Sequence, residues 1–106
     1  MINNKVYGLL GLATKAGKLS FGTESCLETI IKKKAKLVIV TEDAAERTIN
    51  NFEEKCKQNN IDFYVFGKKE DLSKSIGKVN KTVISIKDKN LAGAVKKILN
   101  GGDVIG

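Results

Sequence analysis

The 106-residue chain has no histidine and only two cysteines, Cys26 and Cys56. Without histidine there is no Cys/His zinc set, and the commonest general base in enzymes is missing. Both cysteines lie in apolar helical patterns, which favours buried free thiols over metal ligands or a disulfide. The sequence therefore predicts a protein that is not an enzyme, with no metal and no cofactor.

Long hydrophobic runs are also missing, and no segment approaches the ~18 apolar residues of a membrane span. The first residues, MINNKVY, include a lysine and two asparagines where a signal peptide needs an unbroken apolar stretch. Hydrophobic residues make up 42% and charged residues 29% of the chain, a globular composition. We expect one cytoplasmic domain over residues 1–106, because nothing rich in proline divides the chain.

Basic residues outnumber acidic ones, 19 to 12, which gives a net charge of +7 and a pI near 9.5. This balance favours polyanions, with RNA or DNA ahead of a membrane surface. Arg47 is the single arginine and asparagine is frequent. Compositional bias is therefore an alternative explanation of part of the lysine excess.

Hydrophobic periodicity predicts alternating helices and strands. We expect helices over residues 3–15, 23–33, from 43 onward, 71–76 and around 91–98, and strands over 19–21, 37–40, 63–66 and 82–86. Asp43 with Glu46 has capping-box spacing for the third helix. The order predicts an α/β fold, a three-layer α-β-α sandwich with a small mixed four-stranded sheet. Residues 101–106 are expected to form a flexible tail.

The stretch GLATKAGKL, residues 11–19, resembles a phosphate-binding P-loop but fails its spacing. Five residues separate Gly11 from Gly17 where the motif has four, and Leu19 stands where a hydroxyl must reach magnesium. A helical pattern also precedes it, where the motif requires a strand. We exclude nucleotide hydrolysis on this basis.

Three loops, residues 18–25, 41–44 and 66–69, are expected to converge at strand ends, where α/β proteins place their ligand sites. Lysines flank two of them, whereas the run of lysines at 32–36 is better explained as a solvated helix end. Gly22 begins a helix, whose free amides suit a phosphate. Phe66 is either a core residue, the favoured interpretation, or a surface on which a base stacks.

Three segments, GLATKAGKLSFGTES, AKLVIVTEDAAERT and VFGKKEDLSKSIGK, together resemble the kink-turn-binding ribosomal protein L-seven-Ae superfamily, and most closely its bacterial YlxQ-like branch. The likeness covers about residues 6–99. It implies an α-β-α sandwich, a non-catalytic RNA-binding role, and association with ribosomes or with the translation and transcription machinery.

In that family a glycine, a small residue, Asn, Glu, two variable residues and Lys open the second helix and contact the sheared G·A pairs of kinked RNA. Gly22 and Thr23 match the first two positions, while Glu24 replaces the Asn, Ser25 the Glu and Glu28 the Lys. Ser25 and Glu28 also have the spacing of a helix-capping box, which is a purely structural alternative.

We therefore expect a monomeric RNA-binding protein, or alternatively a protein-interaction adaptor on the same fold. Lysines would hold phosphates, and residues 22–25 would approach a bent or irregular RNA closely. The predicted RNA-contacting residues are Lys15, Lys18, Gly22, Thr23, Glu24, Ser25, Glu28, Glu42, Phe66, Gly67, Lys68 and Lys69.

Overall fold

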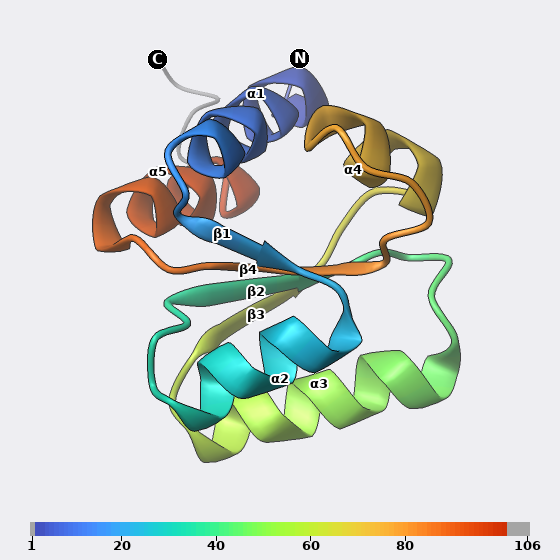
Figure 1. The fold of residues 1–106 in the computed structure, drawn as a ribbon, viewed down its shortest axis with the longest axis vertical. Coiled ribbons are helices and arrows are strands. Elements are labelled where there is room, and N and C mark those ends of the chain that lie inside the picture. Colours follow the sequence, from blue (N-terminus) through green and yellow to red (C-terminus); the bar gives the residue numbers. More distant parts are fainter. Residues whose placement is uncertain (1, 102–106) are drawn as a thin grey trace.

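Helices and strands alternate along residues 2–101, the part of the chain that this computed structural model describes (Figure 1). The elements are α1 (Ile2–Lys15), β1 (Leu19–Phe21), α2 (Thr23–Ile31), β2 (Leu37–Val40), α3 (Glu46–Gln58), β3 (Asp62–Val65), α4 (Lys69–Ser75), β4 (Val83–Ile86) and α5 (Lys89–Leu99). The predicted order is confirmed. The predicted tail, apart from Gly101, lies outside the described residues.

The strands form one sheet in the order β1-β4-β2-β3. β2 and β3 are parallel, whereas β4 is antiparallel to both β1 and β2. Helices α1, α4 and α5 cover one face of this sheet, and α2 and α3 cover the other (Figure 1). The predicted α-β-α sandwich with a mixed four-stranded sheet is thus confirmed.

The LVIV strand β2 is buried on both faces because its side chains alternate between the two helical layers. Leu37 and Ile39 pack in a cluster with residues of α1, α4 and α5. Val38 and Val40 pack with Phe52 and other residues of α2 and α3. All four β2 side chains are fully buried, so a polar residue here would have no route to water.

Cys26 and Cys56 are buried free thiols in the α2–α3 layer, as predicted. Burial disfavours the thiolate and raises the pKa of Cys26 to about 12 and that of Cys56 to about 11. Within residues 2–101, no group of three or more histidine, cysteine and acidic residues is arranged to hold a metal ion. No helix in this part is long and apolar enough to cross a bilayer.

Several predicted boundaries shift by one to three residues. Helix α2 ends at Ile31, β3 begins at Asp62 and α4 at Lys69. The largest error concerns α3, which begins at Glu46 with Ala45 as its N-cap and no side-chain cap. The predicted capping role of Asp43 is wrong because its carboxylate bonds a different element.

Candidate nucleic-acid interface

Three chain turns meet at one end of the sheet, the right-hand end in Figure 1. The Gly22 amide donates to the Val83 carbonyl at 3.0 Å, and the Thr41 amide donates to the Thr82 carbonyl at 2.8 Å. Both turns therefore flank the start of β4. The 66–69 turn joins them, and with residues 77–82 they make up a surface that we call the loop face: residues 22–25, 41–43, 66–69 and 77–82.

Glu42 holds the 66–69 turn in place through three interactions. Its amide donates to the Gly67 carbonyl at 2.8 Å, and its carboxylate accepts the Gly67 amide at 3.2 Å. The same carboxylate pairs with the Lys68 ammonium at 3.2 Å. Gly67 has φ +74°, and the Tyr7 hydroxyl occupies the space where a Cβ at this position would lie.

Asp43 fixes the start of α4. Its two carboxylate oxygens accept the Lys69 amide at 3.0 and 3.2 Å, which satisfies one of the unpaired amides at a helix start. Desolvation favours the protonated acid, but the hydrogen bonds to the carboxylate from the Lys69 amide and from Thr41, together with the nearby charge of Lys68, outweigh it and lower the pKa of the Asp43 carboxyl. Asp43 therefore caps α4 rather than α3.

The beginning of α2 presents backbone amides at the loop face. Gly22 has φ +90° and is the N-cap residue, without a side-chain hydrogen bond to the helix. The Cys26 amide donates to the Gly22 carbonyl at 3.1 Å, so the three amides before it have no intrahelical carbonyl to bond. Thr23, Glu24 and Ser25 are exposed. A helix start with unpaired amides favours the binding of an anion.

The proposed capping box of Ser25 and Glu28 is absent, because Ser25 lies inside the first turn of α2 rather than at its N-cap. Glu28 lies about one and a half turns into α2, and its carboxylate is 3.7 Å from the Lys32 ammonium. Glu28 is exposed on the helix, which leaves it accessible to a ligand.

Two lysines that the sequence analysis did not single out extend the loop face. The Lys78 and Lys81 ammonium groups lie 4.9 and 5.4 Å from the centre of the Phe21 ring, within the range of cation–π attraction. The buried Ser73 hydroxyl bonds both the amide and the carbonyl of Lys81. The available signal was Gly77 and Asn80, turn-forming residues that both have positive φ.

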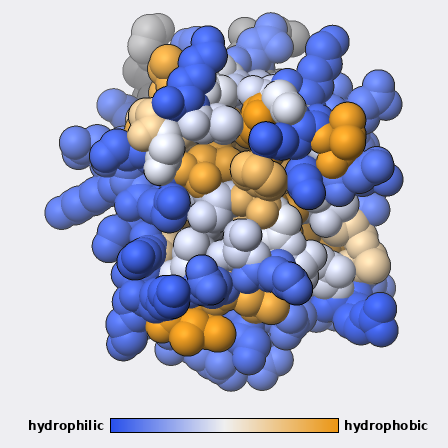
Figure 2. Space-filling view, in the orientation of Figure 1, coloured by the Kyte–Doolittle hydropathy of each residue, from blue (hydrophilic) through white to orange (hydrophobic). Residues whose placement is uncertain are grey.

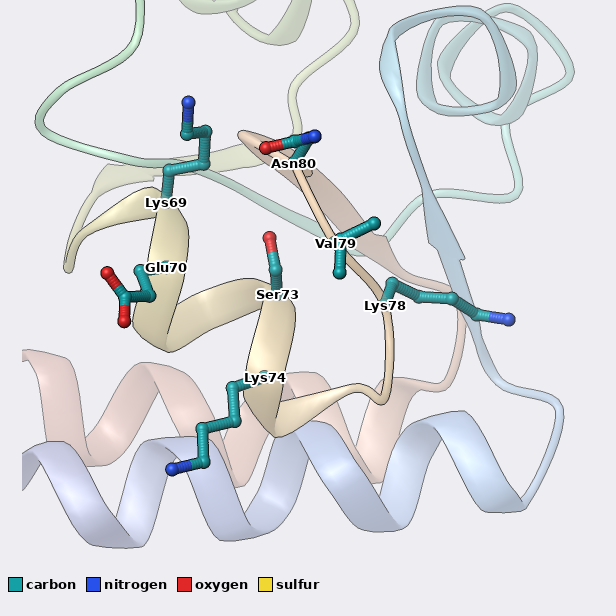
Figure 3. Close-up of a pocket in the computed structure, with 7 residues that line it drawn as sticks. All are labelled: Lys69, Glu70, Ser73, Lys74, Lys78, Val79 and Asn80. Atoms are coloured by element: carbon teal, nitrogen blue, oxygen red, sulfur yellow. The ribbon is translucent and has the colours of Figure 1, made fainter.

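A hollow of about 360 Å³ lies between α4 and the 77–82 loop (Figure 3). Lys69, Lys74 and Lys78 line it, and Val79, which is 75% exposed, adds an apolar surface. Glu70 also lines the hollow, which therefore combines charges of both signs, three of them positive, with an apolar wall.

Phe66 is half-buried and packs with the core cluster under α1. Its ring centre is 5.6 Å from that of Tyr7, with the planes tilted by 50°. This arrangement agrees with the favoured core interpretation, and it supports the turn from below.

Lys15 and Lys18 are not part of the loop face. Lys18 precedes β1, and its carbonyl accepts the Lys87 amide at the other end of β4. The four residue-to-residue steps from Lys18 to Gly22 span about 13 Å of extended chain. Lys15 lies in the last turn of α1, beside that opposite end. The predicted convergence thus holds for residues 22–25 and fails for these two lysines.

Residues 4–95 match the family described as Ribosomal protein L7Ae/L30e/S12e/Gadd45 family. The RNA-binding protein YlxQ of Bacillus subtilis (strain 168) is 31% identical over 94 residues, 89% of this chain and 94% of that protein. The RNA-binding protein YlxQ of Enterococcus faecium is 33% identical over 97 residues, 92% of this chain and 93% of that protein.

Solved structures show the same fold. A Bacillus halodurans protein of unknown function has a TM-score of 0.88 and 30% identity, and the match covers 91% of this chain and 97% of that one. The Giardia lamblia 15.5kD RNA binding protein has a TM-score of 0.81 at 19% identity, and the match covers 99% of this chain and 90% of that one.

Proposed function

Because the chain belongs to the Ribosomal protein L7Ae/L30e/S12e/Gadd45 family, we propose that it is a non-catalytic RNA-binding protein. RNA meets it at the loop face. Its relatives of similar length carry the name RNA-binding protein, and the net charge of +7 suits a polyanion.

The main support for this proposal is that two kinds of RNA-binding group lie on the same surface. The first turn of α2 offers unpaired amides, and Lys69, Lys78 and Lys81 lie on the neighbouring turns. The amides permit close approach to a phosphate or a base edge, and the lysines neutralise the backbone.

The RNA that fits best is bent or irregular, as in a kink-turn. Gly22 and Thr23 match the first two positions of the motif that the sequence resembles, while Glu24, Ser25 and Glu28 change its side chains. Recognition then depends more on the shape of the RNA and on its phosphates than on base-specific hydrogen bonds. We place this activity in the cytoplasm, on ribosomal or other structured RNA.

The test is a salt titration of binding to a kink-turn hairpin. In the loop-face variant, Gln replaces Lys69, Lys78 and Lys81. In the control variant, Gln replaces Lys55, Lys57 and Lys97, so that the same charge is lost from other surfaces. We expect the slope of log affinity against log salt concentration to become less steep by roughly 2 to 3 in the loop-face variant, and to stay unchanged in the control.

Equal effects of the two triple variants would contradict an RNA site at the loop face. Binding of a translation or transcription factor, with no RNA affinity in the wild type, would instead support the adaptor alternative. Crosslinking and sequencing of RNA from the protein's own cells would then identify the natural ligand of a protein that passes the titration.

A further inference from the structure

The end of the sheet opposite the loop face brings together lysines from distant parts of the sequence. The Lys87 amide donates to the Lys18 carbonyl at 2.8 Å, and the Lys36 amide donates to the Ile86 carbonyl at 2.8 Å. Lys18, Lys87 and Lys36 therefore stand at the same level on three neighbouring strands. Such strands are about 4.8 Å apart, so the three lysines form a short row.

More lysines adjoin this row on both sides. Lys36 lines one hollow together with Lys33 and another together with Lys89 and Lys96. The surface is thus continuous from the α2–β2 turn to the first turns of α5. We call it the lysine end: Lys18, Lys33, Lys34, Lys36, Lys87, Lys89 and Lys96. Figure 2 shows hydrophilic side chains along this left-hand edge.

The carboxylates at the lysine end are few and already occupied. Asp62 pairs with Lys96 at 3.1 Å, and Asp88 pairs with Lys18 at 3.5 Å. The other five lysines have no ion-pair partner within residues 2–101. On the loop face, by contrast, Glu24, Glu42 and Asp43 offset Lys68, Lys69, Lys78 and Lys81. The lysine end therefore carries the larger net positive charge.

Folding alone does not explain this concentration of charge. Lys89 is the first residue of α5 and places a cation at the positive end of the helix dipole. The N-cap Asp88 offsets only part of this charge, because its carboxylate accepts the Leu91 amide and also pairs with Lys18. Like charges on adjacent strands also destabilise a sheet. Lys33 and Lys34 follow the end of α2, where cations are favourable, but that benefit does not extend to Lys36, Lys87 and Lys89.

We propose that the lysine end is a second RNA-binding surface, which contacts the phosphate backbone of a duplex without reading its sequence. This inference rests on the proposed function of the loop face and adds a second segment of RNA to it. Lys18, predicted from the sequence as a phosphate contact, keeps that role but at this surface.

The two surfaces face opposite ways along the strands (Figure 1). The molecule measures 34 × 26 × 25 Å, and the strands run across its 26 Å width in this view. A straight duplex therefore cannot touch both ends at once. One protein molecule would hold two RNA segments, or two parts of a folded RNA, on either side of itself.

The first experiment titrates the whole chain with a short fluorescent RNA duplex that has no bulge. The lysine-end variant replaces Lys36, Lys87 and Lys89 with Gln, and the matched control replaces Lys55, Lys57 and Lys97, which lie outside both surfaces. We expect the lysine-end variant to lose about tenfold or more in affinity, with a salt dependence flatter by roughly 2 to 3. The control should bind the plain duplex like the wild type.

Equal losses in the two variants, or no loss in the lysine-end variant, would overturn the proposal. Circular dichroism melts check that both variants fold. Because the measured ligand is a plain duplex, this experiment tests the lysine end independently of the loop face. It remains valid if the wild type does not bind a kink-turn and the proposed function of the loop face is wrong.

A second experiment tests whether both surfaces act together. A biotinylated kink-turn hairpin captures the protein, and the fluorescent duplex is then added in solution. The wild type should retain the duplex, whereas the lysine-end variant should be captured without retaining it. If the wild type instead binds phosphatidylserine vesicles through these lysines and binds no duplex, the surface faces a membrane and the proposal is wrong.

Discussion

Glu42 and Gly67 hold each other by two hydrogen bonds, one from the Glu42 amide to the Gly67 carbonyl at 2.8 Å and one from the Gly67 amide to the Glu42 carboxylate at 3.2 Å. This pair continues the parallel β2–β3 pairing past the last strand residues, because the Phe66 amide already bonds the Val40 carbonyl at 3.0 Å. The turn that presents Lys68 and Lys69 is therefore fixed to the sheet.

Gly67→Ala should destabilise the fold by roughly 1 to 3 kcal/mol, since a non-glycine residue is strained at positive φ and its Cβ would meet the Tyr7 hydroxyl. Tyr7→Phe removes that oxygen and leaves the ring carbon Cζ at 3.4 Å from the new Cβ. In denaturant melts, the double variant should be more stable than additivity predicts. Strict additivity would mean that the hydroxyl does not limit this position.

Val38→Asp should unfold the domain, because an unpaired carboxylate would enter a fully buried position of the central strand. Its cost of several kcal/mol is comparable to the ~5–15 kcal/mol that stabilises a typical domain. Val79→Asp makes the same change at a side chain that is 75% exposed and should leave the melting temperature unchanged. Matching melts of the two variants would refute the assignment of β2.

The hydrogen bond between Asp43 and the Lys69 amide predicts a pH dependence. The pKa of Asp43 is lowered in the folded protein, so its contribution is complete above the unfolded value of about 3.9 and is lost as the pH falls through the lower folded value. The NMR shift of the Lys69 amide should titrate with a midpoint below 3.9. Asp43→Asn should abolish this titration; an unchanged curve would place the responsible group elsewhere.

Both native thiols should resist Ellman's reagent at pH 8, because burial raises the pKa of Cys26 to about 12 and that of Cys56 to about 11. They should react only as fast as the protein unfolds. Ser25→Cys places a thiol at an exposed position one residue from Cys26 and should react at once. Rapid labelling of the wild type in native buffer would show that the α2–α3 layer opens readily.

Glu28→Lys should raise affinity for a kink-turn hairpin. It removes a carboxylate that repels phosphate and that is exposed on α2, and it restores the residue type of the resembled motif. The new lysine loses the ion pair with Lys32, at a cost of only a few tenths of a kcal/mol. The salt plot should steepen by roughly 0.7 to 0.9 for one added phosphate contact.

Glu53→Lys, the same charge change at an exposed position of α3, is the control for Glu28→Lys. A variant at position 28 that folds but gains no more affinity than this control would show that position 28 does not face the RNA.

The sequence was sufficient to predict the order of elements because each strand and helix can be recognised from its local hydrophobic periodicity. The LVIV strand is the clearest case, since four consecutive apolar residues fit only a strand covered on both sides. Gly22 and Gly17 likewise marked real boundaries, and both have positive φ.

The composition of the site was less predictable because it depends on contacts between distant residues. Lys18 and Gly22 are four positions apart and resembled one loop, but the extended β1 strand separates them to opposite ends of the sheet. Asp43 had the local spacing of a cap, yet its partner, Lys69, is 26 residues away. Lys78 and Lys81 are brought to the site by contacts with Phe21 and, for Lys81, by hydrogen bonds to Ser73, none of which the local sequence shows.

The most direct test of an RNA site at the loop face is an NMR titration of the isotope-labelled chain with a kink-turn hairpin. The amides of residues 22–25, 67–69 and 78–81 should shift most, with those of the exposed face of α3 unchanged. Shifts confined to α3, or spread evenly over all exposed lysines, would contradict the assignment of the loop face as the surface that holds the hairpin.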